Sequence, residues 1–146
     1  MLTGEFRNSV DEKGRLMIPS KIRGEIAGNI LILTRGIDTC LWLFPPEEWK
    51  KISDNLMEST SPFNAKARLI QRRIVAPAQE VEVDKAGRIN IPASLREYAG
   101  LKKEAVILGI KKYIEIWDVD LYEAYWRENE KVFQDAAEEL GELVSF

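Results

Sequence analysis

The sequence predicts an α+β fold made of two tandem copies of one βαβ-type unit, with helices at the periphery. The main observation is a repeat: VDEKGRLMIPSKIR at residues 10–23 returns as VDKAGRINIPASLR at residues 83–96. The offset of 73 residues holds without insertion as far as Trp49 and Tyr122. Within each copy, some segments alternate between apolar and polar residues, as strands do, and others place apolar residues at the spacing of a helix. Because there are only two copies, we expect a closed pseudo-twofold body and not an open solenoid.

Each unit contains a tight turn near its start. Residues 11–14 fit a type I turn, with Asp11 first and Gly14 fourth. The aspartate can accept hydrogen bonds from the amides of its own turn. Glycine tolerates the left-handed backbone that follows such a turn in a hairpin. Asp84 and Gly87 occupy the same places in the second unit, so we assign all four residues to the turns.

Strands and a short helix follow the turn of the first unit. Residues 15–18 alternate between polar and apolar side chains, which predicts a half-buried strand. Pro19 ends this strand and suits the first turn of a short helix at residues 20–26. Residues 29–34 and 40–44 are typical of two further strands around a turn.

A helix closes each unit. Residues 45–57 begin with two prolines, carry acids in the first turn and place Trp49, Ile52 and Leu56 on one face. The second unit repeats the strands at residues 103–110 and 113–117 and ends in a longer helix. We expect core or helix–helix contacts for the apolar residues of that last helix, namely Tyr122, Tyr125, Trp126, Phe133 and Leu140.

A basic helix is expected between the two units. Ser61 can cap it, Pro62 suits its first position, and Pro77 ends it. Its bases form either a solvated face or a phosphate-contacting face. The apolar stripe is Phe63, Ala67, Ile70 and Ile74, and the bases are Lys66, Arg68, Arg72 and Arg73. The expected organisation is a first module at 5–50, a helical linker at 51–77, a second module at 78–123 and an acidic C-terminal helix at 124–146.

The composition predicts a soluble cytoplasmic protein. The chain has 146 residues, 45% of them hydrophobic, which is enough for one packed domain. No apolar run approaches the ~20 residues of a membrane span, and the N-terminus lacks the pattern of a signal peptide. The single Cys40 favours a reducing compartment. The absence of histidine excludes the usual histidine-based catalytic and metal sites. We expect no cofactor, no metal and no small-molecule substrate.

Charge is distributed unevenly along the chain. The formal net charge is -3, yet residues 118–146 hold nine acids and two bases. That segment is therefore -7, which leaves residues 1–117 at +4. Such asymmetry suggests different roles for the two parts, although a solvated helix face would also explain the acidic segment.

The repeated motif carries a resemblance to a known family. The pattern D-x-x-G-R-x-x-x-P-x-x-[IL]-R occurs twice, and between the copies an R-x-x-Q-R-like segment spans residues 68–72. With FP and EW after the first unit and WD after the second, the whole chain resembles the MraZ family. Each unit resembles the AbrB-type swapped-hairpin module. The resemblance implies two hairpins interleaved into a small β-barrel. It also implies a nucleoid-associated DNA-binding transcriptional regulator that acts on double-stranded promoter repeats of cell-division and cell-wall genes and assembles into homo-oligomeric rings.

The resemblance also implies which residues contact DNA. The DNA-binding motif of the family, D-x-x-x-R, maps onto Asp11 with Arg15 and onto Asp84 with Arg88. A hairpin that presents arginine can enter a major groove, where the guanidinium pairs bidentately with guanine. At the loop tips, Lys13 and Lys85 are expected to bind phosphates. To Arg23 and Arg96 we assign contacts within the fold or between subunits.

Other interpretations of the same residues stay open. Arg15 and Arg88 can instead form ion pairs with the aspartates of their own hairpins. The chain can be a protein-binding module similar to antitoxins of the same hairpin fold. A third reading is a hydrolase that uses Asp11 and Asp84, although a catalytic dyad needs the two carboxyls almost in contact. We expect that the protein is not an enzyme.

Overall fold

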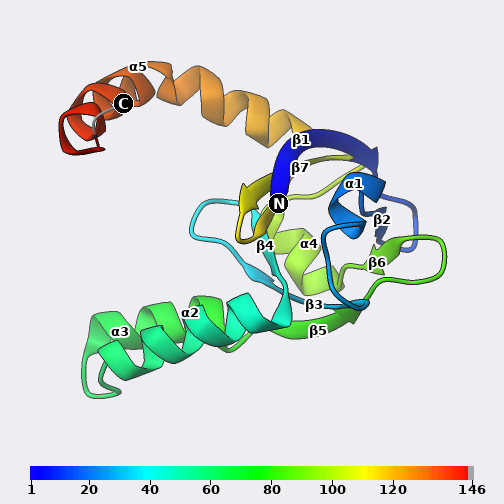
Figure 1. Cartoon of the computed structure of the whole chain (residues 1–146), viewed down its shortest axis with the longest axis horizontal. Helices are drawn as coiled ribbons and strands as arrows, with labels where there is room; N and C mark the ends of the chain where they lie inside the picture. The colour runs from blue at the N-terminus through cyan, green and yellow to red at the C-terminus, as the bar shows by residue number, and fades with distance from the viewer. Residues whose placement is uncertain (145–146) are drawn as a thin grey trace.

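The computed structural model describes residues 1–144, which form eight strands and six helical segments (Figure 1). The two units contain the same order of elements, and the connecting helix between them is the only addition. The first unit contains β1 (Leu2–Ser9), β2 (Arg15–Met17), α1 (Ser20–Arg23), β3 (Ile30–Arg35), β4 (Leu41–Phe44) and α2 (Pro46–Ser59). The linker contains α3 (Ala65–Ile70) and the π-helical turn η1 (Gln71–Val75). The second unit contains β5 (Gln79–Glu82), β6 (Arg88–Asn90), α4 (Ala93–Ala99), β7 (Glu104–Lys111), β8 (Ile114–Asp118) and α5 (Val119–Val144).

The two units exchange strands. Six strands form one antiparallel sheet in the order β1-β7-β8-β4-β3-β5, and β2 pairs with β6 in a second ladder. Strand β1 of the first unit thus pairs with β7 of the second, and β5 of the second pairs with β3 of the first. Neither unit can bury its apolar face alone, because its edge strands are completed by the other unit.

Two residue pairs mark the pseudo-twofold axis. Trp42 and Glu115 are equivalent residues, 73 apart, and they lie directly opposite each other in the β4–β8 ladder. The Trp42 indole Nε1 donates a hydrogen bond of 3.0 Å to a carboxylate oxygen of Glu115. The equivalent pair in the β2–β6 ladder is Leu16 opposite Ile89. The pseudo-twofold axis therefore passes through both ladders.

The expected closed barrel is not found. Strands β1 and β5 are the two ends of the six-stranded sheet, which is open between them. The short ladder of β2 and β6 lies beside this opening and is joined to the end of β1 by an isolated bridge between Val10 and Leu16. Strands β2 and β6 have only three residues each. They are therefore too short to close the sheet by pairing with both β1 and β5. The mixed α+β class is confirmed, and the barrel is replaced by an open sheet with a separate two-stranded ladder.

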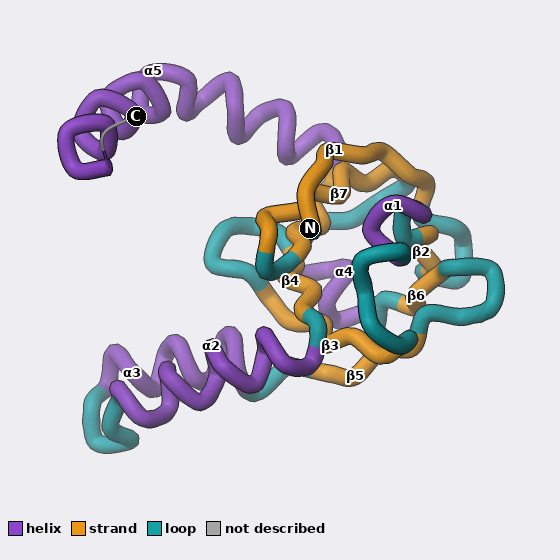
Figure 2. The backbone as a smooth tube through the Cα atoms, viewed as in Figure 1, coloured by secondary structure: helices purple, strands orange, loops and turns teal. Residues whose placement is uncertain are grey.

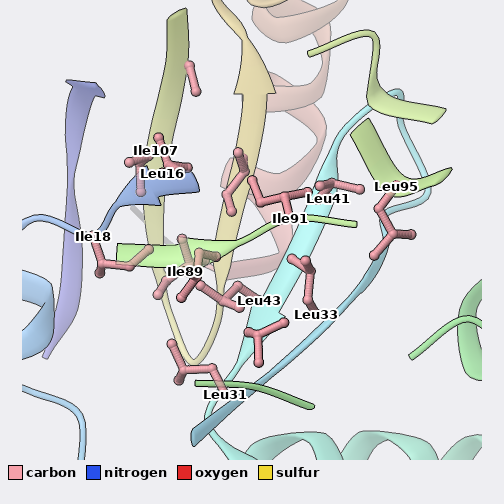
Figure 3. Packing of buried hydrophobic residues seen from close by; sticks show 14 of the residues in the cluster. Leu16, Ile18, Leu31, Leu33, Leu41, Leu43, Ile89, Ile91, Leu95 and Ile107 are labelled. Carbon is pink, nitrogen blue, oxygen red and sulfur yellow. The ribbon is translucent and has the colours of Figure 1, made fainter. Parts of the chain in front are cut away.

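The core lies between the small ladder and the large sheet (Figure 3). Leu16 and Ile89 are fully buried, whereas their neighbour Met17 is exposed, as the alternation predicted. The short helices α1 and α4 add Ile22 and Leu95 to this core. The other large, fully buried side chains of the cluster come from both units, namely Ile18, Leu31, Leu33, Leu41, Leu43, Ile91, Ile107, Ile114 and Ile116.

The helices α2, α3 and α5 form two arms that leave the body on the same side, opposite to β2 and β6 (Figures 1 and 2). The linker helix begins later than the sequence predicted. The side chain of Asn64, and not that of Ser61, accepts hydrogen bonds from the first helical amides. Phe63 therefore precedes the helix and is 93% exposed, so its place in the apolar stripe was wrong. No helix within residues 1–144 is long and apolar enough to cross a membrane.

Candidate nucleic-acid interface

The first Asp–Arg turn has the predicted geometry. The amide of Gly14 donates to the carbonyl of Asp11 at 3.0 Å, which closes the turn, and Gly14 has a φ of 80°. One oxygen of the Asp11 carboxylate accepts from the amides of Lys13 and Arg15 at 3.0 and 2.9 Å. The other oxygen accepts from Nε of Arg15 at 2.7 Å. A single carboxylate thus holds both the backbone of the turn and the side chain that follows it.

The second turn reproduces these contacts. Gly87 has a φ of 86°, and its amide donates to the carbonyl of Asp84 at 2.9 Å. The Asp84 carboxylate accepts from the amides of Ala86 and Arg88 at 2.9 Å and from Nε of Arg88 at 3.1 Å. The second Asp–Arg turn is therefore a structural copy of the first, with a slightly longer hydrogen bond between the arginine Nε and the aspartate.

The ion pairs engage only one edge of each guanidinium. Asp11 and Asp84 contact Nε of Arg15 and Arg88, and among residues 1–144 no further hydrogen bond to either side chain is found. Each arginine side chain is 32% exposed. The ion-pair interpretation is thus realised, yet it leaves the two Nη groups of each arginine available. Those two groups form the fork that binds the O6 and N7 edge of guanine.

An arginine of the opposite unit lies against the glycine of each turn. A Cβ atom added to Gly14 would clash with Nη1 of Arg96, and one added to Gly87 would lie 2.5 Å from the guanidinium carbon of Arg23. Arg96 donates to the carbonyl of Ile91 through Nη1. Arg23 donates through Nε to the carbonyl of Ile18 at 2.9 Å. Arg96 of the second unit thus lies beside the turn of the first, and Arg23 of the first unit lies beside the turn of the second. The repeat in the sequence could not show which turn each arginine contacts.

Backbone hydrogen bonds connect the two turns as well. The carbonyl of Gly14 accepts from the amide of Ile91 at 2.9 Å, and the carbonyl of Gly87 accepts from the amide of Ile18 at 2.8 Å. Together with the β2–β6 ladder, these bonds fix the spacing and orientation of the two hairpins. Both turns lie at the end of the body that faces away from the helical arms (Figure 1). The structure thus brings Arg15 and Arg88 onto one rigid element.

The loop tips differ in charge. In the first turn Glu12 and Lys13 form the exposed tip, and in the second the tip is Lys85 and Ala86. Each tip therefore carries one lysine, but at a different step of the turn. The linker bases, by contrast, belong to the arm on the other side of the molecule (Figure 1).

Acid should weaken both turns. Hydrogen bonds from the backbone amides of Arg15 and Arg88 lower the pKa of Asp11 and Asp84 below the ordinary value of an aspartate. The side-chain bonds from the same arginines act in the same direction. Because the folded-state pKa is lowered, this stabilisation is present above the unfolded pKa and is lost as the pH falls through the folded value. We expect denaturation midpoints to decrease below about pH 4 for this reason.

The matching variant is Asp11→Asn with Asp84→Asn. It should be less stable than the wild type near pH 7, and the difference between the two proteins should shrink as the pH is lowered through the acid range. Comparing urea midpoints of both proteins over this range cancels the titration of all other carboxyls. A difference that stays constant with pH would show that the two carboxylates do not contribute through their ionised form.

Comparisons with known proteins cover almost the whole length of the chain. The family model described as "MraZ protein, putative antitoxin-like" matches residues 1–73 and again residues 74–143. A protein of Treponema denticola named "Transcriptional regulator MraZ" is 54% identical over 142 residues, which are 97% of this chain and 99% of that protein. Proteins with the same name from Treponema pallidum and Thermoanaerobacter pseudethanolicus are 45% and 42% identical, over 97% and 98% of this chain and 95% and 99% of theirs. These relatives are named as regulators of transcription, which confirms that this chain is not an enzyme.

Proposed function

Because this chain belongs to the MraZ family of transcriptional regulators, we propose that it binds double-stranded DNA through its two Asp–Arg hairpins and recognises tandem promoter repeats. As the family resemblance suggests, the regulated genes are those of cell division and cell-wall synthesis, and the protein acts as a repressor in the cytoplasm, at the nucleoid. Several copies of the chain assemble into a ring, so that neighbouring repeats are bound together.

The observation that carries this proposal is the presentation of two arginines on one rigid ladder. Arg15 and Arg88 are each fixed at Nε by an aspartate and keep their Nη groups free of other described partners. Fixing the side chain before binding lowers the conformational entropy that a flexible arginine would lose on contact with a base. The aspartate thereby positions the guanidinium, and the free fork reads the base. Ion pair and base contact are compatible roles of the same residue.

The charge distribution supports DNA at the hairpin end. The exposed bases Lys13 and Lys85 flank the two arginines there and can bind phosphates. The acidic helix α5 leaves the body on the opposite side (Figure 1). This separation keeps the carboxylates of α5 away from the DNA phosphates, which would otherwise repel them.

Removal of either arginine tests the proposal. Arg15→Ala and Arg88→Ala should each weaken binding to a specific promoter fragment by ~1–3 kcal/mol, which corresponds to a roughly 5- to 150-fold increase in Kd. The loss should be smaller on mismatched DNA, because the fork reads bases. Fluorescence anisotropy with labelled DNA measures both values, and circular dichroism should show an intact fold.

Two control variants make the result specific. Arg7→Ala removes an exposed arginine that pairs with Glu123 outside the turns, and it should leave the Kd unchanged. Lys13→Ala should weaken binding to specific and to mismatched DNA by similar factors, because a phosphate contact carries no sequence information. If Arg15→Ala and Arg88→Ala bind the specific fragment as the wild type does, the hairpins do not recognise the DNA sequence.

A further inference from the structure

The outer half of α5 carries an unpaired apolar stripe. Trp126, Phe133 and Leu140 follow one another at spacings of seven residues, so they lie on one face of the helix. Their exposed fractions are 38%, 53% and 51%. The rings of Trp126 and Phe133 are 5.9 Å apart and contact each other edge to face. By contrast Tyr125, nearer the start of the helix, packs against Trp117 of the body. The stripe therefore begins where the helix leaves its own subunit.

Carboxylates flank this stripe. Residues 127–144 contain six acids and two bases. Of these six acids, only Asp135 forms an ion pair with a residue of the described range 1–144, namely with Lys131 of the same helix. Glu128 lines a hollow together with Arg73 of its own subunit. The remaining acids are exposed and available to an external cation: Glu130, Glu138, Glu139 and Glu142.

The other arm carries a groove of matching chemistry. Helix α2 and the linker segment α3–η1 enclose an apolar cavity of about 180 Å³. Ile37, in the turn between β3 and β4, is 71% exposed at this cavity. Ile70 and Ile74 line it together with an adjoining cavity, so the two form one continuous groove. The other residues of the apolar floor are Trp42, Trp49, Ile52 and Leu56.

Arginines without acidic partners form the rim of this groove. Arg35, Arg72 and Arg73 line its open part beside Leu69, which is 65% exposed. None of the three forms an ion pair with the described residues 1–144. Arg35 and Arg73 lie over the ring of Tyr98 at 5.2 and 5.7 Å, and Nε of Arg35 is buried with no hydrogen-bond partner in the described chain. The rim thus offers oriented cations to a ligand with carboxylates.

We propose that the outer half of α5 from one copy of this protein binds in the arginine-rimmed groove of a second copy. Within residues 1–144, α5 alone combines an exposed aromatic stripe with unpaired carboxylates, and the groove combines an apolar floor with unpaired arginines. In its own subunit the outer half of α5 lies well apart from the α2–α3 arm (Figure 1). The contact is therefore intermolecular. This inference rests on the self-assembly that is part of the proposed function.

The interface has a direction. Each copy offers one donor helix and one acceptor groove, which are different surfaces, so the contact is heterologous and adds copies head to tail. Such a contact closes into a ring when its rotation permits and otherwise forms a filament. Both surfaces lie on the arms, so the hairpins at the opposite end stay free for DNA (Figure 2).

Two full-length variants test the direction of the contact. The acceptor variant, Leu69→Glu with Arg72→Glu, changes two exposed residues of the groove. The donor variant, Phe133→Lys, changes one exposed residue of the stripe. The matched control, Ile110→Glu with Lys112→Glu, makes the same kind of change as the acceptor variant at an exposed site near the β7–β8 turn. Light scattering after size-exclusion chromatography measures the mass of each, and circular dichroism verifies folding.

The wild type and the control should be multimeric, and each of the two interface variants should be monomeric. An equimolar mixture of the acceptor and donor variants should give a 1:1 dimer and no larger species, because each copy keeps one intact surface. If the acceptor variant has the same mass as the wild type, the groove does not bind α5 of a second copy, and the proposal is overturned. A mixture that stays monomeric, or that grows beyond a dimer, would overturn it as well.

The DNA-binding role is measured separately. Both interface variants leave the turns unchanged, so anisotropy with a single-repeat DNA should give the wild-type Kd. If the wild type itself fails to bind that DNA, the proposed function fails, while the masses still decide the interface. If the DNA is bound and the masses do not change, the interface alone is refuted.

Discussion

DNA that carries several tandem copies of the recognition site should bind this protein about 10²–10⁴-fold more tightly than DNA with a single copy. In the proposed mode of binding, one chain contributes two arginines to base contact, Arg15 and Arg88, on a body of modest positive charge. We therefore expect a single site to be bound weakly. In a multimer, the first contact tethers the assembly, and every later contact becomes effectively intramolecular.

Titration of labelled DNA with one, two and four repeats at fixed ionic strength measures this gain. Binding to all of them should weaken as salt rises, because phosphate contacts release counterions, and the slope should be steeper for the longer DNA. The acceptor variant Leu69→Glu with Arg72→Glu is the control, since it should bind one repeat normally and gain little from additional repeats. Equal affinity of the wild type for one and for four repeats would refute the avidity model and leave single-site binding intact.

Gly14→Val should destabilise the protein by about 2–5 kcal/mol. Gly14 has a φ of 80°, and a residue with a Cβ in this region costs ~1–2 kcal/mol. The added Cβ would also clash with Nη1 of Arg96, so the guanidinium has to move away from its place beside the turn. That movement breaks the charged hydrogen bond to the carbonyl of Ile91, worth ~1.5–3 kcal/mol. The free energy of unfolding from urea titration measures the sum.

Gly28→Ala separates the two causes. Gly28 has a φ of 78°, but a Cβ added there meets nothing within 4 Å. Gly28→Ala should therefore lower the free energy of unfolding only by the cost of a side chain at a positive φ. Gly14→Ala should lower it by this cost and by the cost of displacing Arg96. In an Arg96→Ala background, the excess cost of Gly14→Ala over Gly28→Ala should shrink to the part caused by the carbonyl oxygen of Ile91, which would lie 3.2 Å from the added Cβ. Equal losses at both glycines in the wild type would mean that the cross-unit arginine contributes nothing to the turn.

The local elements could be predicted from the sequence because neighbouring residues decide them. The spacing of Asp11 and Gly14 determines a turn that closes on itself, so its hydrogen bonds and the positive φ of the glycine were predicted before any fold was known. Alternation placed Leu16 inside and Met17 outside. The repeat itself predicted the pseudo-twofold symmetry, since equal segments form equal elements.

Only the tertiary structure decided what the two units do to each other. No local signal specifies that β1 pairs with β7, that Arg96 packs on Gly14, or that the large sheet stays open. Nor could periodicity show that Phe133 lies outside the core, because an apolar stripe looks the same whether its own subunit covers it or not. These outcomes depend on contacts between residues far apart in sequence. Such contacts are decided by which surfaces can be buried together, and that becomes defined only when the chain has folded.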